Sequence, residues 1–127
     1  MQTPHDRLVR HVFSVATHAA GLLRCVLRPE IVAQVDWTTL RLEAGPAVDA
    51  DLAERRTDLL FSVLLRGKRA LIYVLVEHQS KLDPWMALRV SGYIQRIYED
   101  IQRASTGEPR LPPILGMVLY PSEGGWT

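Results

Sequence analysis

Apolar residues in this chain follow two patterns. In some segments they recur at the spacing of a helix, and in others they are nearly continuous, as in buried strands. Over residues 5 to about 27 they recur every three or four positions, which predicts an amphipathic helix that could break near Gly21. A second helical pattern follows Asp83-Pro84, where the aspartate caps and the proline takes the first turn, and it runs to about Ala104. Its inward side is expected to carry Met86, Val90, Tyr93, Ile94, Ile97 and Ile101.

Two shorter runs, TDLLFSVLL and ALIYVLVEH, are rich in β-branched and aromatic residues and are separated only by RGKR. A two-residue loop with Gly67 at its first central position suits a type II′ turn, so we interpret the runs as a β-hairpin. With this turn Asp58 lies directly opposite Glu77, and Arg56 lies opposite Gln79. Directly opposed residues share one face of the sheet, with Cβ atoms about 5 Å apart.

Three further segments complete the order of elements. PEIVAQV predicts a short helix, because proline is tolerated in a first turn, and a short strand is expected near residues 39–43. ILGMVLY is a continuous apolar run of strand length, most simply a buried strand. The order helix, short strand, hairpin, helix, strand predicts an α/β fold with a mixed sheet between helices, formed by residues 1–127 as one domain.

Polar chemistry gathers on one face of the predicted hairpin. Alternate residues of a strand share a face, so Glu77, Gln79 and Lys81 point the same way, and Asp58 joins them from the partner strand. Two acids facing each other on a buried hairpin repel unless a cation lies between them. Two carboxylates suit a hard ion such as Mg²⁺ (or Mn²⁺), which keeps several waters and accepts phosphate oxygens. We therefore predict that Asp58 and Glu77 bind a metal that activates water, while Gln79 positions the water or a phosphate.

Composition narrows the class of protein. The 127 residues are 47% hydrophobic and 23% charged, which argues against disorder, and a net charge of +1 neither requires nor excludes nucleic acid. The single cysteine, Cys25, is expected in the core of the first helix and cannot form an internal disulfide, which fits the cytoplasm. No apolar run approaches the roughly 20 residues of a membrane span, so no membrane is expected as a partner.

The spacing Asp58…Glu77-x-Gln79 on a hairpin resembles the PD-(D/E)xK nuclease superfamily and its restriction-endonuclease-like core. The segments PHDRLVRHVF, RTDLLFSV, YVLVEHQSKLDPWMALRVSGY and PPILGMVLYPSEGGWT are similar to the YhgA-like transposase family of recombination-promoting nucleases. This resemblance implies a Mg²⁺-dependent DNA endonuclease that promotes recombination, with Asp58, Glu77 and Gln79 at the positions of the catalytic triad. It also implies that Asp6, in the family's N-terminal His-Asp pair, lies near the site.

The chain departs from the family pattern in two respects. Gln79 stands where the superfamily has lysine, and an amide cannot stabilise charge as a cation does, so Lys81 or Arg56 could substitute. Family members are usually longer, so we expect a single PD-(D/E)xK nuclease-like domain that lacks the family's C-terminal part. The alternative to an active nuclease is therefore a catalytically inactive DNA- or protein-binding remnant of the same fold. DNA is the expected partner, and a homodimer is left open.

Some candidate residues also have a structural explanation. Helix capping accounts for Asp6, and His78 lies on the opposite face of its strand from Glu77, where it is more simply structural. Arg89 and Tyr93 are four residues apart on one helix face. Contact with a DNA phosphate is one prediction for this pair, and a packed tyrosine with an arginine at the surface is the other.

Overall fold

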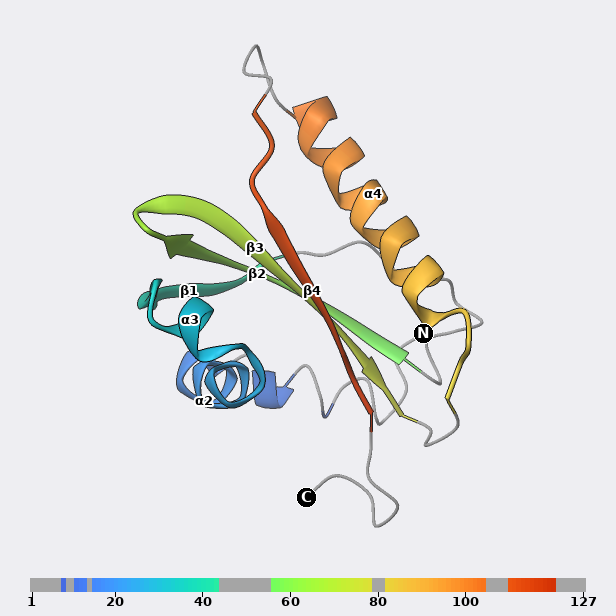
Figure 1. Cartoon of the computed structure of the whole chain (residues 1–127), viewed down its shortest axis with the longest axis horizontal. Coiled ribbons are helices and arrows are strands. Elements are labelled where there is room, and N and C mark those ends of the chain that lie inside the picture. Colours follow the sequence, from blue (N-terminus) through green and yellow to red (C-terminus); the bar gives the residue numbers. More distant parts are fainter. Residues whose placement is uncertain are drawn as a thin grey trace.

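The protein has an α/β fold built on one mixed sheet (Figure 1). The computed structural model describes residues 8, 11–13, 15–43, 56–78, 82–104 and 110–120. The elements are α2 (Ala16–Val26), α3 (Pro29–Val32), β1 (Val35–Glu43), β2 (Arg56–Leu65), β3 (Lys68–Glu77), α4 (Met86–Ala104) and β4 (Ile114–Leu119). The four strands lie in the order β1-β2-β3-β4, with β4 parallel to β3 and the other pairs antiparallel. The predicted fold class is confirmed, and this arrangement is compatible with a restriction-endonuclease-like core.

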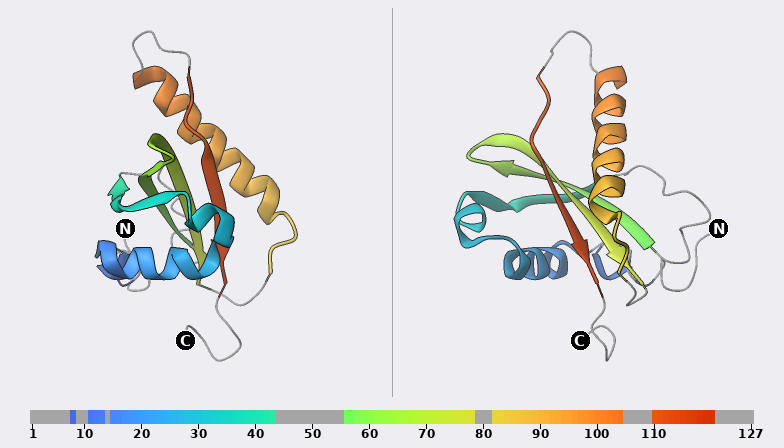
Figure 2. Two further views of the ribbon diagram at one scale, coloured as in Figure 1. Left: turned by 60° about the vertical axis from the view of Figure 1, so that its left-hand side comes forward. Right: turned by 45° about the vertical axis from the view of Figure 1, so that its right-hand side comes forward.

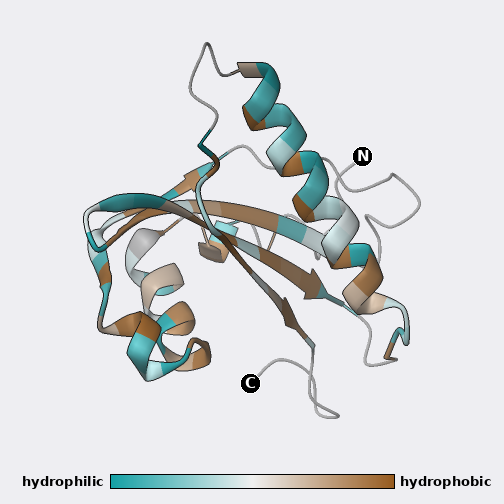
Figure 3. Cartoon of the chain, turned by 45° about the horizontal axis from the view of Figure 1, so that its top comes forward, coloured by the Kyte–Doolittle hydropathy of each residue, from teal (hydrophilic) through white to brown (hydrophobic). Residues whose placement is uncertain are grey.

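Helices cover the two faces of the sheet. Helix α2 packs on one face and α4 on the other (Figure 2). Strand β3 is covered on both sides, so every residue from Ala70 to Glu77 is buried. This double covering explains the nearly continuous apolar run, because neither face of the strand meets water. Figure 3 shows the same distribution, with hydrophobic residues along the central strands and along one side of α4.

The hairpin between β2 and β3 turns one residue earlier than predicted. Arg66 and Gly67 are its two central residues, with φ of 52° and 75°, and Leu65 pairs with Lys68. Positive φ at both central positions is the mark of a type I′ turn rather than the expected type II′ turn. Gly67 therefore occupies the second central position, and the pairing of the two strands shifts by two residues.

The shifted register corrects two predicted pairs. Asp58 lies opposite Leu75 rather than Glu77, and Arg56 lies opposite Glu77 rather than Gln79. The alternation of faces has a period of two, so a shift of two residues leaves every side chain on its predicted face. Asp58 and Glu77 therefore still share a face, as diagonal rather than direct neighbours.

Other predicted elements form with altered bounds. Strand β1 begins at Val35 rather than near residue 39. The helix predicted over residues 5–27 is interrupted at Val15, which is extended, and not near Gly21, so α2 begins at Ala16 and continues through Gly21 without a break. Cys25 is exposed, contrary to the expectation that it lies in the core. The reason is that α2 buries Ala19 and Leu23 against the sheet, and Cys25 falls outside that narrow stripe.

Helix α4 carries the predicted apolar side and packs closely on β4. The prediction that β4 is a buried strand is wrong, because β4 lies at the edge of the sheet and its residues are half-buried or exposed. Met86, Tyr93 and Ile97 are buried. A Cβ on Gly116 of β4 would lie 3.0 Å from Ile94 Cδ1, so the glycine permits the close approach of helix and strand. No helix among the described residues is both long and apolar enough to cross a membrane.

Candidate active site

A cluster of charged residues lies where β2 begins and β3 ends. Arg56, the first residue of β2, donates from Nε to Oε2 of Glu77, the last residue of β3, over 2.7 Å. The Nη2 atom of Arg56 donates to Oδ2 of Asp83, at 3.0 Å, just before α4. The same Asp83 oxygen accepts a bond of 2.6 Å from Nε of Arg89 in α4. One guanidinium group thus joins the end of β3 to the start of α4.

The cluster has a buried inner pair, Arg56 and Glu77, and an outer pair in which only Arg89 is exposed. The side chains of Arg56 and Glu77 are 5% and 2% exposed, whereas that of Arg89 is 44% exposed. Removing charges from water is costly unless they are paired and hydrogen-bonded, so the inner pair has to stay together. Arg89, by contrast, lies at the rim, where solvent weakens its attraction to Asp83.

Asp58 lies on the same face as this inner pair, two residues along β2 from Arg56. Its side chain is buried, and it is a diagonal neighbour of Glu77 on the adjacent strand. Diagonal neighbours have Cβ atoms somewhat less than about 7–8 Å apart, a distance from which an aspartate and a glutamate can reach one ion.

Tyr73 lies on the same face of the sheet as Asp58 and packs against Tyr93 of α4. Among the described residues its buried hydroxyl has no hydrogen-bond partner. Burial raises the pKa of the Tyr73 phenol, the nearby Asp58 carboxylate raises it further, and the Arg96 guanidinium acts in the opposite direction. The phenol is therefore held in its neutral form beside the Asp58 carboxylate.

The pKa values of Asp83, a member of this cluster, and of the neighbouring Tyr120 are both shifted. The Oδ1 atom of Asp83 accepts the Trp85 backbone N–H over 2.9 Å. That bond is the main cause that holds the pKa of Asp83 below its ordinary value of 3.8; partial burial opposes it, and Arg89 reinforces it. Burial, and then the charges of Glu77 and Asp83, raise the pKa of Tyr120, which follows β4. Tyr120 therefore lies within electrostatic reach of both carboxylates.

His78 belongs to the other face of the sheet. Its Nε2 atom lies 2.8 Å from the hydroxyl oxygen of the buried Thr57. Thr57 alternates with Arg56 and Asp58 along β2, so this contact is on the opposite side of the strand from the carboxylates.

The structure brings together Asp58, Glu77 and Arg56 from the predicted set. Gln79, Lys81 and Asp6 lie outside the described residues. The placement of Arg56 does not favour its predicted use as a substitute for lysine, because its Nε and Nη2 atoms already bind carboxylates.

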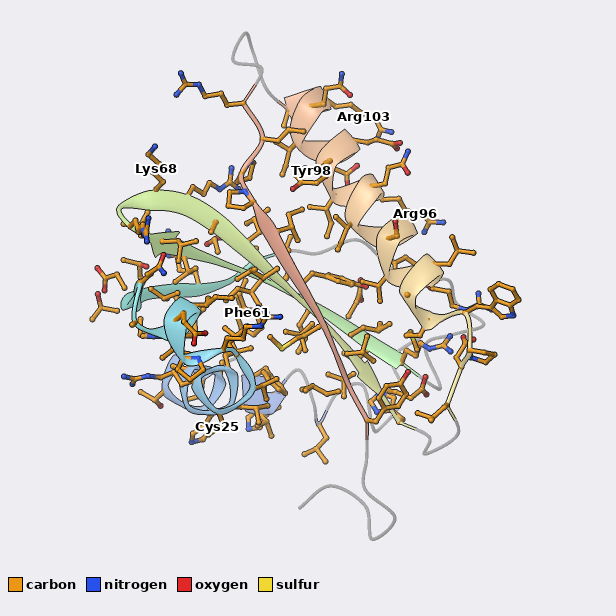
Figure 4. All side chains as sticks on the ribbon, viewed as in Figure 1. Cys25, Phe61, Lys68, Arg96, Tyr98 and Arg103 are labelled. Atoms are coloured by element: carbon orange, nitrogen blue, oxygen red, sulfur yellow. The ribbon has the colours of Figure 1, made fainter. Side chains whose placement is uncertain are left out.

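The predicted pair Arg89 and Tyr93 separates into a surface residue and a core residue. Tyr93 is buried, and its ring packs against that of Tyr73 with centroids 6.3 Å apart. Arg96, which Figure 4 shows on the side of α4 turned away from β4, lies 5.7 Å from the centre of the Tyr93 ring. Of the two residues, only Arg89 is placed where a phosphate could reach it.

Sequence reasoning identified Asp83 only as a helix cap and did not identify Tyr73 or Tyr120. Asp83 pairs with Arg56 and Arg89, which are 27 and 6 positions away. Neither separation is a helical or strand period, so no pattern along the chain indicates these pairs. The capping position of Asp83 was the only local signal available.

The chemistry of the carboxylates fits a hard divalent ion. Mg²⁺ prefers oxygen ligands, retains several waters and needs only one or two protein carboxylates, which Asp58 and Glu77 can provide. No group of three or more His, Cys, Asp or Glu side chains is placed to hold a metal within the described residues. An ion at Glu77 would also have to share this carboxylate with Arg56.

Comparison with known proteins agrees with the resemblance seen in the sequence. The YhgA-like transposase model, described as "Putative transposase, YhgA-like", matches residues 3–127. The recombination-promoting nucleases RpnC and RpnA of Escherichia coli (strain K12) are 33% and 31% identical over 95% and 93% of this chain. No solved structure matches the chain significantly.

The relatives differ in length and in the activity that their names state. The chain spans 40% of the length of RpnC and 40% of that of RpnA. A shorter relative from the same strain is 34% identical over 72% of this chain and 88% of its own length. It is named "Putative inactive recombination-promoting nuclease-like protein YjiP". The family match covers nearly all of the sequence, and this chain belongs to the YhgA-like transposase family.

Proposed function

We propose that this chain is the nuclease core of a recombination-promoting nuclease and hydrolyses DNA phosphodiester bonds with Mg²⁺ or Mn²⁺. One observation carries the proposal. Asp58 and Glu77 are buried carboxylates on one face of two adjacent strands, although burying two acids together is costly without a cation. RpnC and RpnA, to which the chain is similar, are named recombination-promoting nucleases, which supports DNA as the substrate of this acid pair.

In this proposal the residues of the chain have distinct tasks. Asp58 and Glu77 would hold the ion, which when bound polarises the phosphate and favours deprotonation of a water molecule. Arg56 orients Glu77 through its bond to Oε2 and so fixes the carboxylate in advance. Gln79, two residues after Glu77, would position the water or a phosphate oxygen. Arg89 at the rim would contact a phosphate.

Asp6 and Lys81 complete the proposed site as auxiliary residues. The family resemblance suggests an acid from the N-terminal segment, which Asp6 would supply. Lys81 would provide the positive charge that Gln79 lacks, and this role passes to it because Arg56 is committed to Glu77 and Asp83.

A second function is favoured by the same arginine. Arg56 already neutralises Glu77 inside the protein, so the acid pair has one internal cation without any metal. In addition, the relative YjiP is named as inactive. On this alternative the fold binds DNA or protein and does not cleave.

Cleavage of supercoiled plasmid DNA tests the two functions. Wild-type protein with Mg²⁺ or Mn²⁺ is expected to nick the plasmid, and a chelator is expected to stop it. Asp58→Asn and Glu77→Gln are expected to lower the rate about 100-fold or more, since each removes a carboxylate that would hold the ion, and the ion stabilises the charge that develops on the phosphate. Glu43→Gln is the matched control, because Glu43 is an exposed acid of the same sheet. DNA binding without cleavage, unchanged in both site variants, would favour the inactive module.

A further inference from the structure

Trp85 is a large aromatic side chain that the fold leaves in solvent, with 64% of its surface exposed. Its backbone is nevertheless fixed at both ends. The N–H donates to Asp83 Oδ1 over 2.9 Å, and the carbonyl accepts the Arg89 backbone N–H over 3.0 Å. An exposed ring on a fixed backbone is a ready surface on which another flat group can stack.

Two arginines follow Trp85 along the same side of the helix. Trp85 lies in the turn just before α4, and its carbonyl accepts the backbone N–H of Arg89, so the turns of the helix can be counted from it. On this count Arg89 and Arg96, four and eleven positions later, fall within about 40° of position 85 around the helix axis. The two arginines are seven residues apart, which is about 10 Å along the axis. Gly92 lies between them, and a Cβ added there would meet nothing within 4 Å, so the surface between the arginines is open.

This side of α4 runs beside the candidate active site. Arg89 shares Oδ2 of Asp83 with Arg56, which in turn holds Glu77. Further along, Arg96 lies over the Tyr93 ring, at 5.7 Å, and that ring packs against Tyr73. Tyr73 points to the same face of the hairpin as Asp58. A polyanion lying along this side of the helix would therefore reach the rim of the candidate active site at Arg89.

We propose that Trp85, Arg89 and Arg96 bind a single-stranded segment of DNA, with Trp85 stacked on an unpaired base and the arginines on phosphates. The inference rests on the proposed function for the identity of the polymer. It adds the substrate class, which is DNA with unpaired bases rather than a continuous duplex. Stacking on an aromatic ring tolerates any sequence, because every base presents a π-face.

The main rival occupant of this surface is a second copy of the chain. Leu82 and Leu88 are also exposed, at 70% and 68%, and together with Trp85 they could form an apolar contact. Leu88 is three positions from Trp85 and so lies about 60° away from it around the helix. By the same count Glu99 and Arg103 also lie on Trp85's side, and they pair with each other over 3.8 Å. The remaining charges of this side, Arg89 and Arg96, favour an anionic partner over an apolar one.

Binding of a labelled oligothymidylate, followed by fluorescence anisotropy with chelator present, tests the inference. Trp85→Ala is expected to weaken binding about 5- to 150-fold, the range found for loss of one stacked base, and Trp85→Phe to retain most of the affinity. Leu88→Ala, which removes an apolar side chain of similar exposure, is expected to bind as wild type. A duplex of equal length is expected to bind more weakly and to be insensitive to Trp85→Ala.

The arginines are tested by the dependence of affinity on salt. Arg89→Gln and Arg96→Gln are each expected to reduce the slope of log affinity against log salt by about 0.7, the value for one phosphate contact on a single strand. Arg69→Gln is the matched control, since it removes the same charge from an exposed position beside the hairpin turn. It is expected to leave the slope unchanged.

Several results would overturn the inference. Equal binding by Trp85→Ala and wild type excludes stacking. Equal losses in Trp85→Ala and Leu88→Ala, with wild-type dimers in sedimentation that Trp85→Ala dissociates, assign the surface to a second copy. Plasmid cleavage without single-strand binding removes this inference and leaves the proposed function standing. Single-strand binding that depends on Trp85, without any plasmid cleavage, removes the proposed nuclease function and leaves the binding surface standing.

Discussion

At the scale of single residues, Arg56 explains how two acids from different elements are kept together. Its guanidinium binds Glu77 through Nε and Asp83 through Nη2. A planar fork with several donors can serve two carboxylates at once, which a lysine ammonium does with far less geometric control. Arg56 is therefore expected to contribute to folding as well as to the orientation of Glu77.

Arg56→Gln is expected to destabilise the protein by about 3 kcal/mol or more, because it leaves the buried Glu77 charge without its cation. Arg89→Gln is the matched control, since Arg89 binds the same Asp83 oxygen from the surface and should cost about 1 kcal/mol or less. Urea unfolding of both variants gives the comparison. Equal losses would show that the inner pair is not a buried ion pair in solution.

Asp83 predicts a dependence of stability on pH. Its pKa is lowered in the folded protein, so the ionised carboxylate stabilises the fold above its ordinary value of 3.8. This contribution is lost as the pH falls through the lowered folded value. The difference in unfolding free energy between wild type and Asp83→Asn is thus expected to be constant near pH 7 and to shrink below about pH 4. Unfolding of both proteins across this range measures it, and a difference independent of pH would contradict the assignment.

At the scale of elements, the hairpin shows what the sequence could and could not specify. The two strands and the faces of Asp58 and Glu77 follow from apolar runs with a period of two. The register does not, because it depends on which residue takes each turn position. Glycine tolerates positive φ more easily than any other residue, so the turn with only one positive φ, at Gly67 in the first central position, was the expected one. In the structure Arg66 takes the first central position, with a φ of 52°.

Replacing Gly67 in the turn and Gly21 in α2 by alanine is expected to change stability in opposite directions. Gly67→Ala is expected to destabilise the protein by about 1 kcal/mol or more, since an alanine is strained at a φ of 75°. Gly21→Ala should stabilise it by up to about 1 kcal/mol, because Gly21 lies inside α2 with open space around it. Thermal unfolding of both variants checks the signs. A stable Gly67→Ala protein would mean that the turn has another conformation.

At the scale of the whole molecule, the sheet and its two covering layers could be predicted, whereas the connections between distant charges could not. Apolar periodicity placed α4, β3 and β4, because burial of a face leaves a regular trace in the sequence. The pairs that Asp83 makes leave no such trace, since they depend on where α4 lies over the sheet. The candidate site is therefore half visible in the sequence: Asp58, Glu77 and Arg56 are identified as candidates, but the pairing of Arg56 with Glu77 and Asp83 is not.

The central claim is that Asp58 and Glu77 together bind a divalent metal ion. Binding of Mn²⁺, followed by loss of the electron paramagnetic resonance signal of the free ion, tests it without reference to cleavage or DNA. Wild type and the control Glu43→Gln are expected to bind with equal affinity, and Asp58→Asn and Glu77→Gln to bind about 10-fold or more weakly. Equal Mn²⁺ affinity in all four proteins, or none in the wild type, would contradict the account.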